Sequence, residues 1–173
     1  MSTLRIMMGC PGSGKSTFAT SMMMTGEVYV SRDAIRFSMV AEDEEYFSKE
    51  DEVFNKFIEI IDINLAAGKT VYADATHLNR KARLKLLNSL TVKPDFIEII
   101  YMKTPLEVCL ERNDKRKGTR AFVPHSVIRR MYASIEEPKY KEGKYEYTII
   151  WIKEPDCVIG VEEGMKDVDL RDE

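Results

Sequence analysis

The chain has 173 residues, 44% of them apolar or aromatic, and a formal net charge of −3. This length suits one α/β domain with a sizeable core, and no apolar run approaches the length of a membrane span, so we expect a soluble protein with no membrane partner. The negative total excludes a globally basic coat for nucleic acid, although residues 112–130 are strongly basic and can receive a polyanion locally.

The cysteine content indicates the compartment. Cys10, Cys109 and Cys157 are an odd number of thiols without metal-ligand spacing, which is typical of reduced cysteines inside a cell. The first residues lead directly into an apolar run without a charged leader, so no secretory signal is expected. We therefore expect a cytoplasmic protein, or one in the host-cell cytoplasm if a phage encodes it.

The first motif along the chain is a Walker A sequence, G-x-x-x-x-G-K-[ST], between an apolar strand pattern at 4–8 and a helical pattern that follows. Glycines let backbone N–H groups turn inward around a phosphate, and the positive end of the next helix strengthens that field. A merely tight connection is the alternative, but the residue types and both flanks match the motif. The motif therefore predicts a site for ATP or another nucleoside triphosphate, built from Gly9, Cys10, Pro11, Gly12, Ser13, Gly14, Lys15, Ser16 and Thr17.

Three residues of this loop carry specific expectations. Lys15 should reach the terminal phosphates, and Ser16 should supply a hydroxyl ligand to Mg²⁺, because magnesium is usually held by few protein oxygens together with phosphates and water. Cys10 invites interpretation as a redox switch. No second cysteine near it forms a CxxC pair, so we favour the interpretation that Cys10 is simply a small residue that the turn tolerates.

A short β-rich run at 27–30 is followed by a candidate catalytic group. Ser31 fits the N-cap of a helix through Phe37, and Asp33 lies in the first turn of that helix. A kinase needs a group that accepts the proton of the acceptor hydroxyl, so Asp33 is a candidate general base; the alternative is a carboxylate that only caps or solvates the helix start. Arg36 lies on the same face at i+3 and is a candidate for holding an anionic group of the acceptor.

The next strand ends in a second carboxylate. An acidic, solvated connection near Glu42 leads to an amphipathic helix at 49–67, which Gly68 ends, and a buried strand at 70–73 then runs into Asp74. Asp74 occupies the usual position of a carboxylate that orients magnesium through water.

Asn79 can cap a basic helix at 79–90, and the alternative for Asp74 is a cap before that same helix. Thr76 and His77 border the same crevice, where Thr76 is a candidate substrate contact. A lone histidine is weak evidence, so His77 is assigned no chemistry beyond a hydrogen bond.

The second half of the chain continues the alternation of strands and helices. The expected elements are a strand at 96–102, a helix that Thr104 and Pro105 open as cap and first-turn proline, a helix from 123, and a strand at 145–152. The polar and acidic residues 153–173 are expected to form a tail.

A basic segment at about 112–122 follows the helix that Thr104 and Pro105 open. A solvated charge run is the usual interpretation of such a segment. Here it lies at the carboxyl end of an α/β unit, and phosphoryl transfer requires cations around the transferring group. Arg112 and Arg116 are four residues apart, so we expect both to face the nucleotide from a lid that closes over it.

The whole pattern predicts an α/β fold in which one domain, residues 1–173, forms a doubly wound parallel sheet with helices on both faces. Ligands of such sheets bind beyond the carboxyl ends of the strands. That rule selects four loops, at 9–16, 31–36, 74–79 and 112–120.

Four stretches together resemble the kinase domain of bacteriophage T4-type polynucleotide kinase, and they span about three quarters of the chain. They are G-C-P-G-S-G-K-S-T from Gly9, S-R-D-A-I-R from Ser31, R-N-D-K-R with the following G-T from Arg112, and V-P with V-I-R-R-M-Y from Val123. The resemblance implies a three-layer P-loop kinase fold and transfer of the ATP γ-phosphate to the 5′-hydroxyl of DNA or RNA, in nucleic-acid repair.

By position, the resemblance also implies roles for single residues. Lys15 and Ser16 would hold the phosphates and magnesium, and Asp33 would be the general base. Arg36 would grip the phosphate next to the 5′-terminal nucleoside, and Arg116 would stabilise the transferring phosphate. The partner would be a single-stranded or frayed 5′-OH end of a polynucleotide.

This sequence also departs from that family. Bifunctional members carry a phosphatase domain with an Asp-x-Asp-Gly-Thr motif, which is absent here, so 3′-phosphatase activity is not expected. Lys117 and Phe122 are extra residues that shift the register of the lid. Fold does not fix the acceptor, so a small-molecule P-loop kinase for sugars, nucleosides or antibiotics stays open, as does a non-catalytic module that interacts with partners in an NTP-dependent manner.

Overall fold

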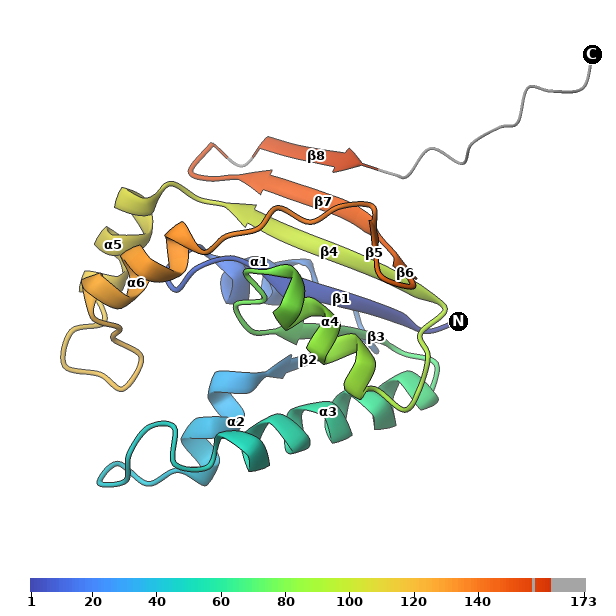
Figure 1. The fold of residues 1–173 in the computed structure, drawn as a ribbon, viewed down its shortest axis with the longest axis horizontal. Helices are drawn as coiled ribbons and strands as arrows, with labels where there is room; N and C mark the ends of the chain where they lie inside the picture. The colour runs from blue at the N-terminus through green and yellow to red at the C-terminus, as the bar shows by residue number, and fades with distance from the viewer. Residues whose placement is uncertain (157, 163–173) are drawn as a thin grey trace, which may run out of the picture.

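The computed structural model describes residues 1–156 and 158–162 of the chain. A six-stranded sheet forms its centre, with strand order β2-β3-β1-β4-β7-β8. Its strands are β1 Thr3–Met8, β2 Val28–Ser31, β3 Thr70–Asp74, β4 Phe96–Lys103, β7 Thr148–Lys153 and β8 Val158–Glu162. The first five strands are parallel and β8 pairs antiparallel with β7, so the predicted parallel sheet is confirmed with one antiparallel edge strand (Figure 1).

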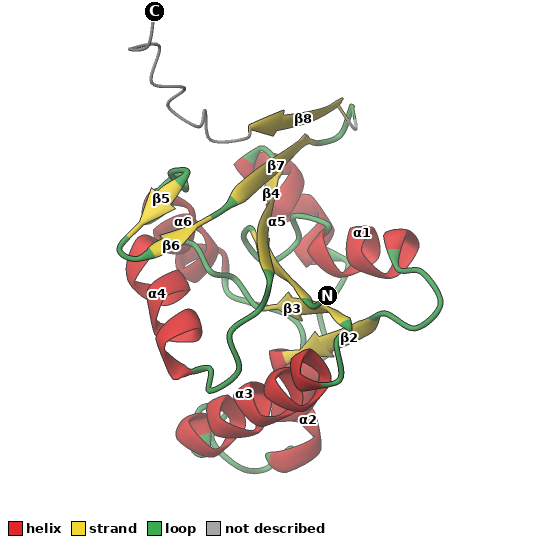
Figure 2. Cartoon of the chain, turned by 90° about the vertical axis from the view of Figure 1, so that its right-hand side faces the viewer, coloured by secondary structure: helices red, strands yellow, loops and turns green. Residues whose placement is uncertain are grey.

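Helices cover both faces of this sheet, as the alternating pattern predicted (Figure 2). They are α1 Lys15–Met22, α2 Arg32–Met39, α3 Glu50–Ala66, α4 Arg80–Ser89, α5 Leu106–Asp114 and α6 His125–Ala133. On one face, Ile6 and Met8 of β1 belong to the same core as Phe57 of α3 and Leu86 of α4. Met7 points to the opposite face because side chains alternate along a strand, and its core includes α1. The molecule therefore has the three-layer α/β/α architecture of a P-loop kinase.

Two polar side chains start helices where the sequence predicted caps. Ser31 Oγ accepts a hydrogen bond from the Ala34 N–H at 3.2 Å, and Asn79 Oδ1 accepts one from the Ala82 N–H at 2.9 Å. These bonds satisfy N–H groups that have no partner within the first turn of a helix. The expected cap at Thr104 is wrong: Pro105 is the N-cap residue of α5, and the Thr104 hydroxyl instead donates to the Ser13 carbonyl at 2.7 Å.

The C-terminal part of the described chain differs from expectation in two places. The single strand predicted at 145–152 is divided: Tyr145–Glu146 is β6, which pairs with β5 Lys141–Glu142 in a separate hairpin, and β7 begins at Thr148. The acidic tail predicted at 153–173 is wrong for 158–162, because these residues form β8. Its hydrogen bonds to β7 hold it at the sheet edge. Residues 157 and 163–173 of that predicted tail lie outside the described residues.

Within the described residues, no helix has both the length and the apolar character needed to cross a bilayer.

Candidate functional site

A cavity of about 320 Å³ lies at the carboxyl edge of the parallel strands. All four loops that the sequence selected contribute to it: the Walker A loop, the start of α2, residues 74–76 after β3, and Arg116 of the lid segment 112–122. In Figure 1 the α2–α3 connection and the lid segment with α6 lie on the two sides of this end of the molecule. The position agrees with the rule that parallel α/β sheets bind ligands beyond the ends of their strands.

The Walker A loop has the backbone shape of a phosphate cradle. Gly12 adopts φ +81°, and a Cβ added there would lie 2.4 Å from the Cys109 carbonyl oxygen. Gly14 adopts φ +94° as the N-cap residue of α1, which has no side-chain cap, so the first N–H groups of α1 are available to an anion. Ser13 Oγ is buried and has no hydrogen-bond partner in the described part of the chain. These features fit a bound triphosphate.

Lys15 is buried within this cradle, and its Nζ donates to the Cys10 carbonyl at 3.0 Å. Burial lowers the pKa of Lys15, while the nearby Asp74 carboxylate opposes that change. An ammonium group in this position gains from an added negative charge, which a terminal phosphate provides. The predicted role of Lys15 therefore agrees with its surroundings.

Asp74 joins the loop to the neighbouring strands. Its Oδ2 accepts hydrogen bonds from Ser16 Oγ at 2.6 Å and from the Tyr29 hydroxyl at 2.5 Å. Burial and the adjacent carboxylate raise the pKa of Tyr29 to about 12, so this phenol stays a donor at neutral pH. Asp74 does not cap α4, because Asn79 does so.

The oxygens of Ser16 and Asp74 suit Mg²⁺, which typically uses one or two protein oxygens beside phosphates and waters. Within the described residues no group of three His, Cys, Asp or Glu side chains could hold a metal by protein ligands alone. This donor set fits magnesium that arrives with a nucleotide.

Asp33 and Arg36 lie side by side on the cavity wall. Arg36 Nη1 donates to Asp33 Oδ1 at 2.5 Å, as expected for residues three apart on one helix. The Asp33 side chain is 69% exposed, whereas that of Arg36 is 6% exposed. Ser31, and not Asp33, caps α2, so capping does not account for this carboxylate.

Glu50 holds Arg36 in place from the first turn of α3. Arg36 Nη2 donates to Glu50 Oε2 at 2.8 Å and its Nε donates to the same oxygen at 3.1 Å. Arg32 also forms an ion pair with Glu50. No sequence pattern linked Glu50 to Arg36, because the two are fourteen positions apart on different helices.

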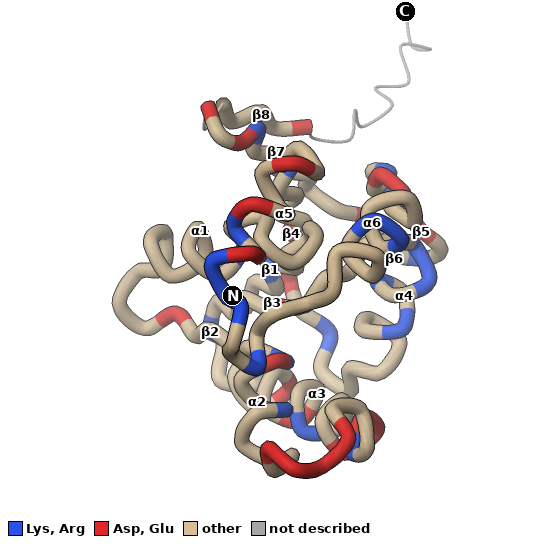
Figure 3. The backbone as a smooth tube through the Cα atoms, turned by 90° about the vertical axis from the view of Figure 1, so that its left-hand side faces the viewer, with Lys and Arg blue, Asp and Glu red and all other residues tan. Residues whose placement is uncertain are grey.

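Two aromatic residues of the α2–α3 connection, Tyr46 and Phe47, also line the cavity. The guanidinium carbon of Arg36 lies 4.8 Å from the centre of the Tyr46 ring and 5.3 Å from that of Phe47. Sequence analysis missed both residues. They follow an acidic run that is typical of a solvated loop, and this run is the red segment between α2 and α3 in Figure 3.

Arg116 and Arg112 of the lid segment occupy different positions. Arg116 lines the cavity. Arg112 lies beside the Walker A loop, where it pairs with Glu154 at 3.1 Å and its Nη1 is 3.5 Å from the Gly12 carbonyl. The two therefore do not share one face of the site, because α5 ends at Asp114.

Arg120, which the sequence did not single out, ties the lid segment to the end of α2. Its Nη2 donates to the Val40 carbonyl at 2.7 Å and its Nη1 to the Phe37 carbonyl at 3.4 Å. A cation is favourable at a helix C-terminus, where carbonyl groups lack partners within the helix. The lid segment and the helix that carries Asp33 are thereby connected.

Of the remaining candidates, Thr76 lines the cavity and His77, next to it in the chain, is buried. The Thr76 carbonyl accepts from the Gly9 N–H at 3.1 Å. His77 is buried with φ +44°, and its Nδ1 lies 2.8 Å from the Met7 carbonyl. Burial lowers its pKa to about 4, so the ring is neutral at pH 7 and donates to that carbonyl.

Cys10 faces away from the cavity and packs with Leu78 and Cys109 in a small core. Burial is the main cause that raises the pKa of the Cys10 thiol to about 12, so it is not a thiolate at neutral pH.

Comparisons with known proteins agree with this fold. The chain is 27% identical over 143 residues to the transcription factor bHLH140 of Arabidopsis thaliana; that match covers 80% of this chain and 15% of the plant protein. A chain of the Pnkp1/Rnl/Hen1 RNA repair complex is 27% identical, with a TM-score of 0.68, over 77% of this chain and 43% of that chain. This chain therefore spans less than half of the length of either relative.

Two further structures share the fold at lower identity. A sugar kinase from Janibacter is 20% identical, with a TM-score of 0.55, over 87% of this chain and 84% of that one. A gluconokinase from Sinorhizobium meliloti is 22% identical, with a TM-score of 0.51, over 86% and 82% of the two chains. The family model described as the AAA domain, AAA_33, matches residues 4–138, which is more than half of the chain. With this match and a cavity built on the Walker A loop, the protein belongs to the AAA_33 family of P-loop domains.

Proposed function

We propose that this protein is a polynucleotide 5′-hydroxyl kinase, which transfers the γ-phosphate of ATP to the 5′-OH of DNA or RNA during nucleic-acid repair. The observation that carries the proposal is that Asp33 and Arg36, a carboxylate beside a cation, line the same cavity as the Walker A loop. Similarity to a chain of an RNA repair complex supports a polynucleotide acceptor. We expect this reaction inside the cell, with single-stranded or frayed ends as the preferred partner.

In this proposal each side chain has one task. Lys15 and the N–H groups of the Walker A loop bind the triphosphate, and Ser16 and Asp74 would hold a magnesium ion, which would neutralise part of its charge. Arg116 contacts the transferring phosphoryl group, which carries spread negative charge in the transition state. Arg112 contributes to the nucleotide side of the site from its position beside Gly12.

Asp33 receives the proton of the acceptor. The 5′-oxygen forms a bond to the γ-phosphorus while the bond from that phosphorus to the β–γ bridging oxygen breaks, and ADP leaves. Asp33 Oδ1 accepts a hydrogen bond from Arg36, so we assign the incoming proton to Oδ2. Thr76 contacts the acceptor from the neighbouring loop.

Arg36 binds the phosphate on the 3′ side of the terminal nucleoside. An arginine that contacts phosphate carries no base information, so sequence preference should be small and binding should weaken with salt. The guanidinium is held in advance by Glu50, which reduces the entropy lost when the phosphate binds.

The direct test is transfer of label from γ-labelled ATP to a 5′-OH oligonucleotide, with gluconate and simple sugars as parallel acceptors. We expect labelled oligonucleotide only, and no product from a Lys15→Ala variant, which lacks the buried ammonium group. A cavity of about 320 Å³ also suits a small acceptor, and two sugar-specific kinases share this fold, so a small-molecule kinase is the second candidate.

Product from sugars alone would establish that second candidate. If no acceptor is labelled and an Asp33→Ala variant keeps its biological role, the protein is a non-catalytic module that responds to nucleotide.

Glu50→Gln should raise the KM for the oligonucleotide by roughly tenfold with little change in the KM for ATP. The amide removes the charge that orients the Arg36 guanidinium, but it leaves the Walker A loop untouched. Steady-state kinetics with each substrate varied in turn measure both constants. Glu59→Gln is the matched control, because Glu59 lies on the same helix and, among the residues that the structure describes, pairs only with exposed Lys56. Equal changes in both KM values would contradict a role for Glu50 in positioning the acceptor.

A further inference from the structure

We infer that Tyr46 and Phe47 form an aromatic platform that stacks on the base of the acceptor's 5′-terminal nucleotide. This inference rests on the proposed function, and it adds a binding site for the base to the sites for the hydroxyl and the phosphate. Both residues line the cavity that contains Asp33 and Arg36. They come from the α2–α3 connection, in which the acidic run 42–45 directly precedes them.

Hydrogen bonds of Tyr46 with Arg36 and Asp33 anchor the platform to the protein. The Tyr46 hydroxyl lies 3.2 Å from Arg36 Nη1, from which it accepts, and 3.4 Å from Asp33 Oδ1, to which it donates. The Phe47 ring meets the Tyr46 ring edge to face, with 4.8 Å between their centroids and 89° between their planes. Such a pair is an ordinary stabilising arrangement of aromatic rings. Tyr46 is thereby bound to both proposed acceptor contacts, and it supports Phe47.

Phe47 nevertheless leaves most of its surface open, since it is 61% exposed. A single exposed phenylalanine needs no special account. Here, however, the open ring lines the cavity and lies within 5.3 Å of the cation assigned to the acceptor phosphate. An apolar ring at the mouth of a charged site is well placed for a ligand that is itself flat and aromatic.

The geometry of a nucleotide links these three positions. One sugar carries the 5′-hydroxyl, the 3′-phosphate and the base, so a hydroxyl at Asp33 and a phosphate at Arg36 place the base beside them. The Asp33 and Arg36 side chains are in direct contact with each other. The aromatic rings that lie against Arg36 are those of Tyr46 and Phe47. Every base has a π-face, so the platform should accept all four bases and should favour an end that carries a base over one that lacks it.

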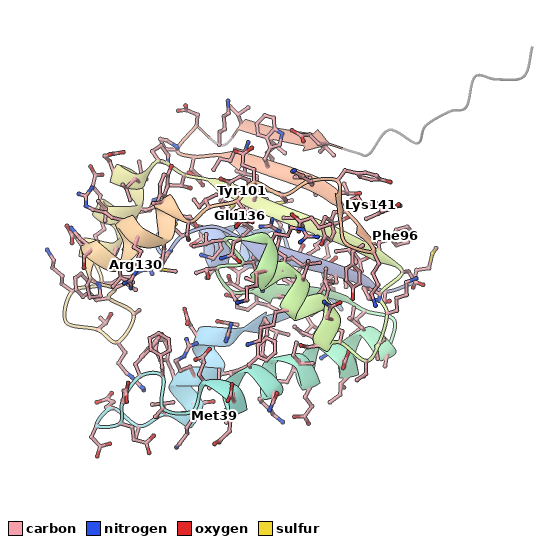
Figure 4. All side chains as sticks on the ribbon, viewed as in Figure 1. Met39, Phe96, Tyr101, Arg130, Glu136 and Lys141 are labelled. Atoms are coloured by element: carbon pink, nitrogen blue, oxygen red, sulfur yellow. The ribbon has the colours of Figure 1, made fainter. Side chains whose placement is uncertain are left out.

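The test compares a 5′-OH oligonucleotide with the same oligonucleotide made abasic at its 5′-terminal position. Phe47→Ala should raise the KM for the normal oligonucleotide about tenfold, equivalent to about 1.4 kcal/mol, and should leave the KM for the abasic one unchanged. Phe47→Trp should restore the normal value, because it replaces the lost ring. Phe96→Ala is the matched control: Phe96 is 54% exposed, and Figure 4 shows it at the end of the sheet far from Met39 and the α2–α3 connection.

The outcomes separate this inference from the proposed function. If the wild type phosphorylates both oligonucleotides and Phe47→Ala raises both KM values equally, the kinase stands and the platform is overturned, because Phe47 then only supports Arg36. No change in either KM overturns it as well. If the wild type labels no oligonucleotide, the proposed polynucleotide kinase fails. The platform is then judged by the quenching of 2-aminopurine riboside fluorescence: loss of quenching in Phe47→Ala alone supports it, and equal quenching in all variants overturns it.

Discussion

Asp33→Asn is expected to lower kcat for phosphoryl transfer to an oligonucleotide by a factor on the order of 10²–10⁴, because an amide cannot accept the proton of the attacking hydroxyl. The substitution preserves size and leaves the Ser31 cap of α2 in place. Arg36 keeps its two-point contact with Glu50, so the acceptor phosphate should still bind. Rates with γ-labelled ATP at saturating oligonucleotide measure the loss.

The affinity for ATP should stay within about twofold of the wild-type value, because Asp33 is not part of the Walker A loop. Titration with a fluorescent ATP analogue measures that affinity without turnover. Asp51→Asn is the control, since Asp51 is an exposed aspartate in the first turn of α3. An equal loss of ATP affinity in Asp33→Asn and in Arg36→Ala would contradict the proposed division between nucleotide and acceptor residues. A change in kcat smaller than about fivefold would remove Asp33 from the role of general base.

The glycine-rich turn of the Walker A loop and the helix caps could be predicted from the sequence, because local chemistry determines them. The Walker A loop requires particular residues at fixed spacing, and the caps at Ser31 and Asn79 depend on neighbours three residues away. The convergence of Asp33 and Asp74 on that loop followed from a rule about the carboxyl ends of parallel strands. These inferences needed no knowledge of contacts between distant parts of the chain.

The rest depends on contacts that no local pattern encodes. Phe47 follows a run of acidic residues and indicates nothing by itself until the fold brings it to Arg36. The strand β8 is short and lies among polar residues, so no alternation of apolar and polar side chains predicts it. It forms because the edge strand β7 offers backbone groups with which it can pair. Arg83 lies in a basic helix and carries a charge that is seldom fully buried unless it is paired, yet it is fully buried.

Arg83 is buried because its charge has a complete set of partners. Its Nε donates to Glu142 Oε2 at 3.0 Å and its Nη2 donates to Glu142 Oε1 at 2.5 Å, which joins α4 to the β5–β6 hairpin. Its Nη1 donates to the carbonyls of His77 and Glu136 at 3.2 and 3.1 Å. The His77 carbonyl belongs to the loop that follows Asp74. The Arg83–Glu142 ion pair therefore helps to hold the loop whose residues 74–76 line the cavity.

Glu142→Leu should therefore destabilise the protein by about 3–5 kcal/mol, because it leaves the Arg83 guanidinium buried without its counter-charge. The midpoint of urea unfolding, followed by circular dichroism at pH 7, measures this loss. Glu146→Leu is the matched control on the same hairpin: Glu146 is exposed and pairs with exposed Lys141, so its loss should be below about 0.5 kcal/mol.

The double variant Arg83→Met/Glu142→Leu tests whether burial of an unpaired charge causes the loss. Removing both charges should recover more than about half of the stability lost in Glu142→Leu, since an apolar pair of similar volume often replaces a buried ion pair at little cost. Recovery will be incomplete, because the carbonyls of His77 and Glu136 lose a donor. Losses that simply add across the two single variants would show that the two charges are not coupled, and the stability of this region would then depend on packing alone.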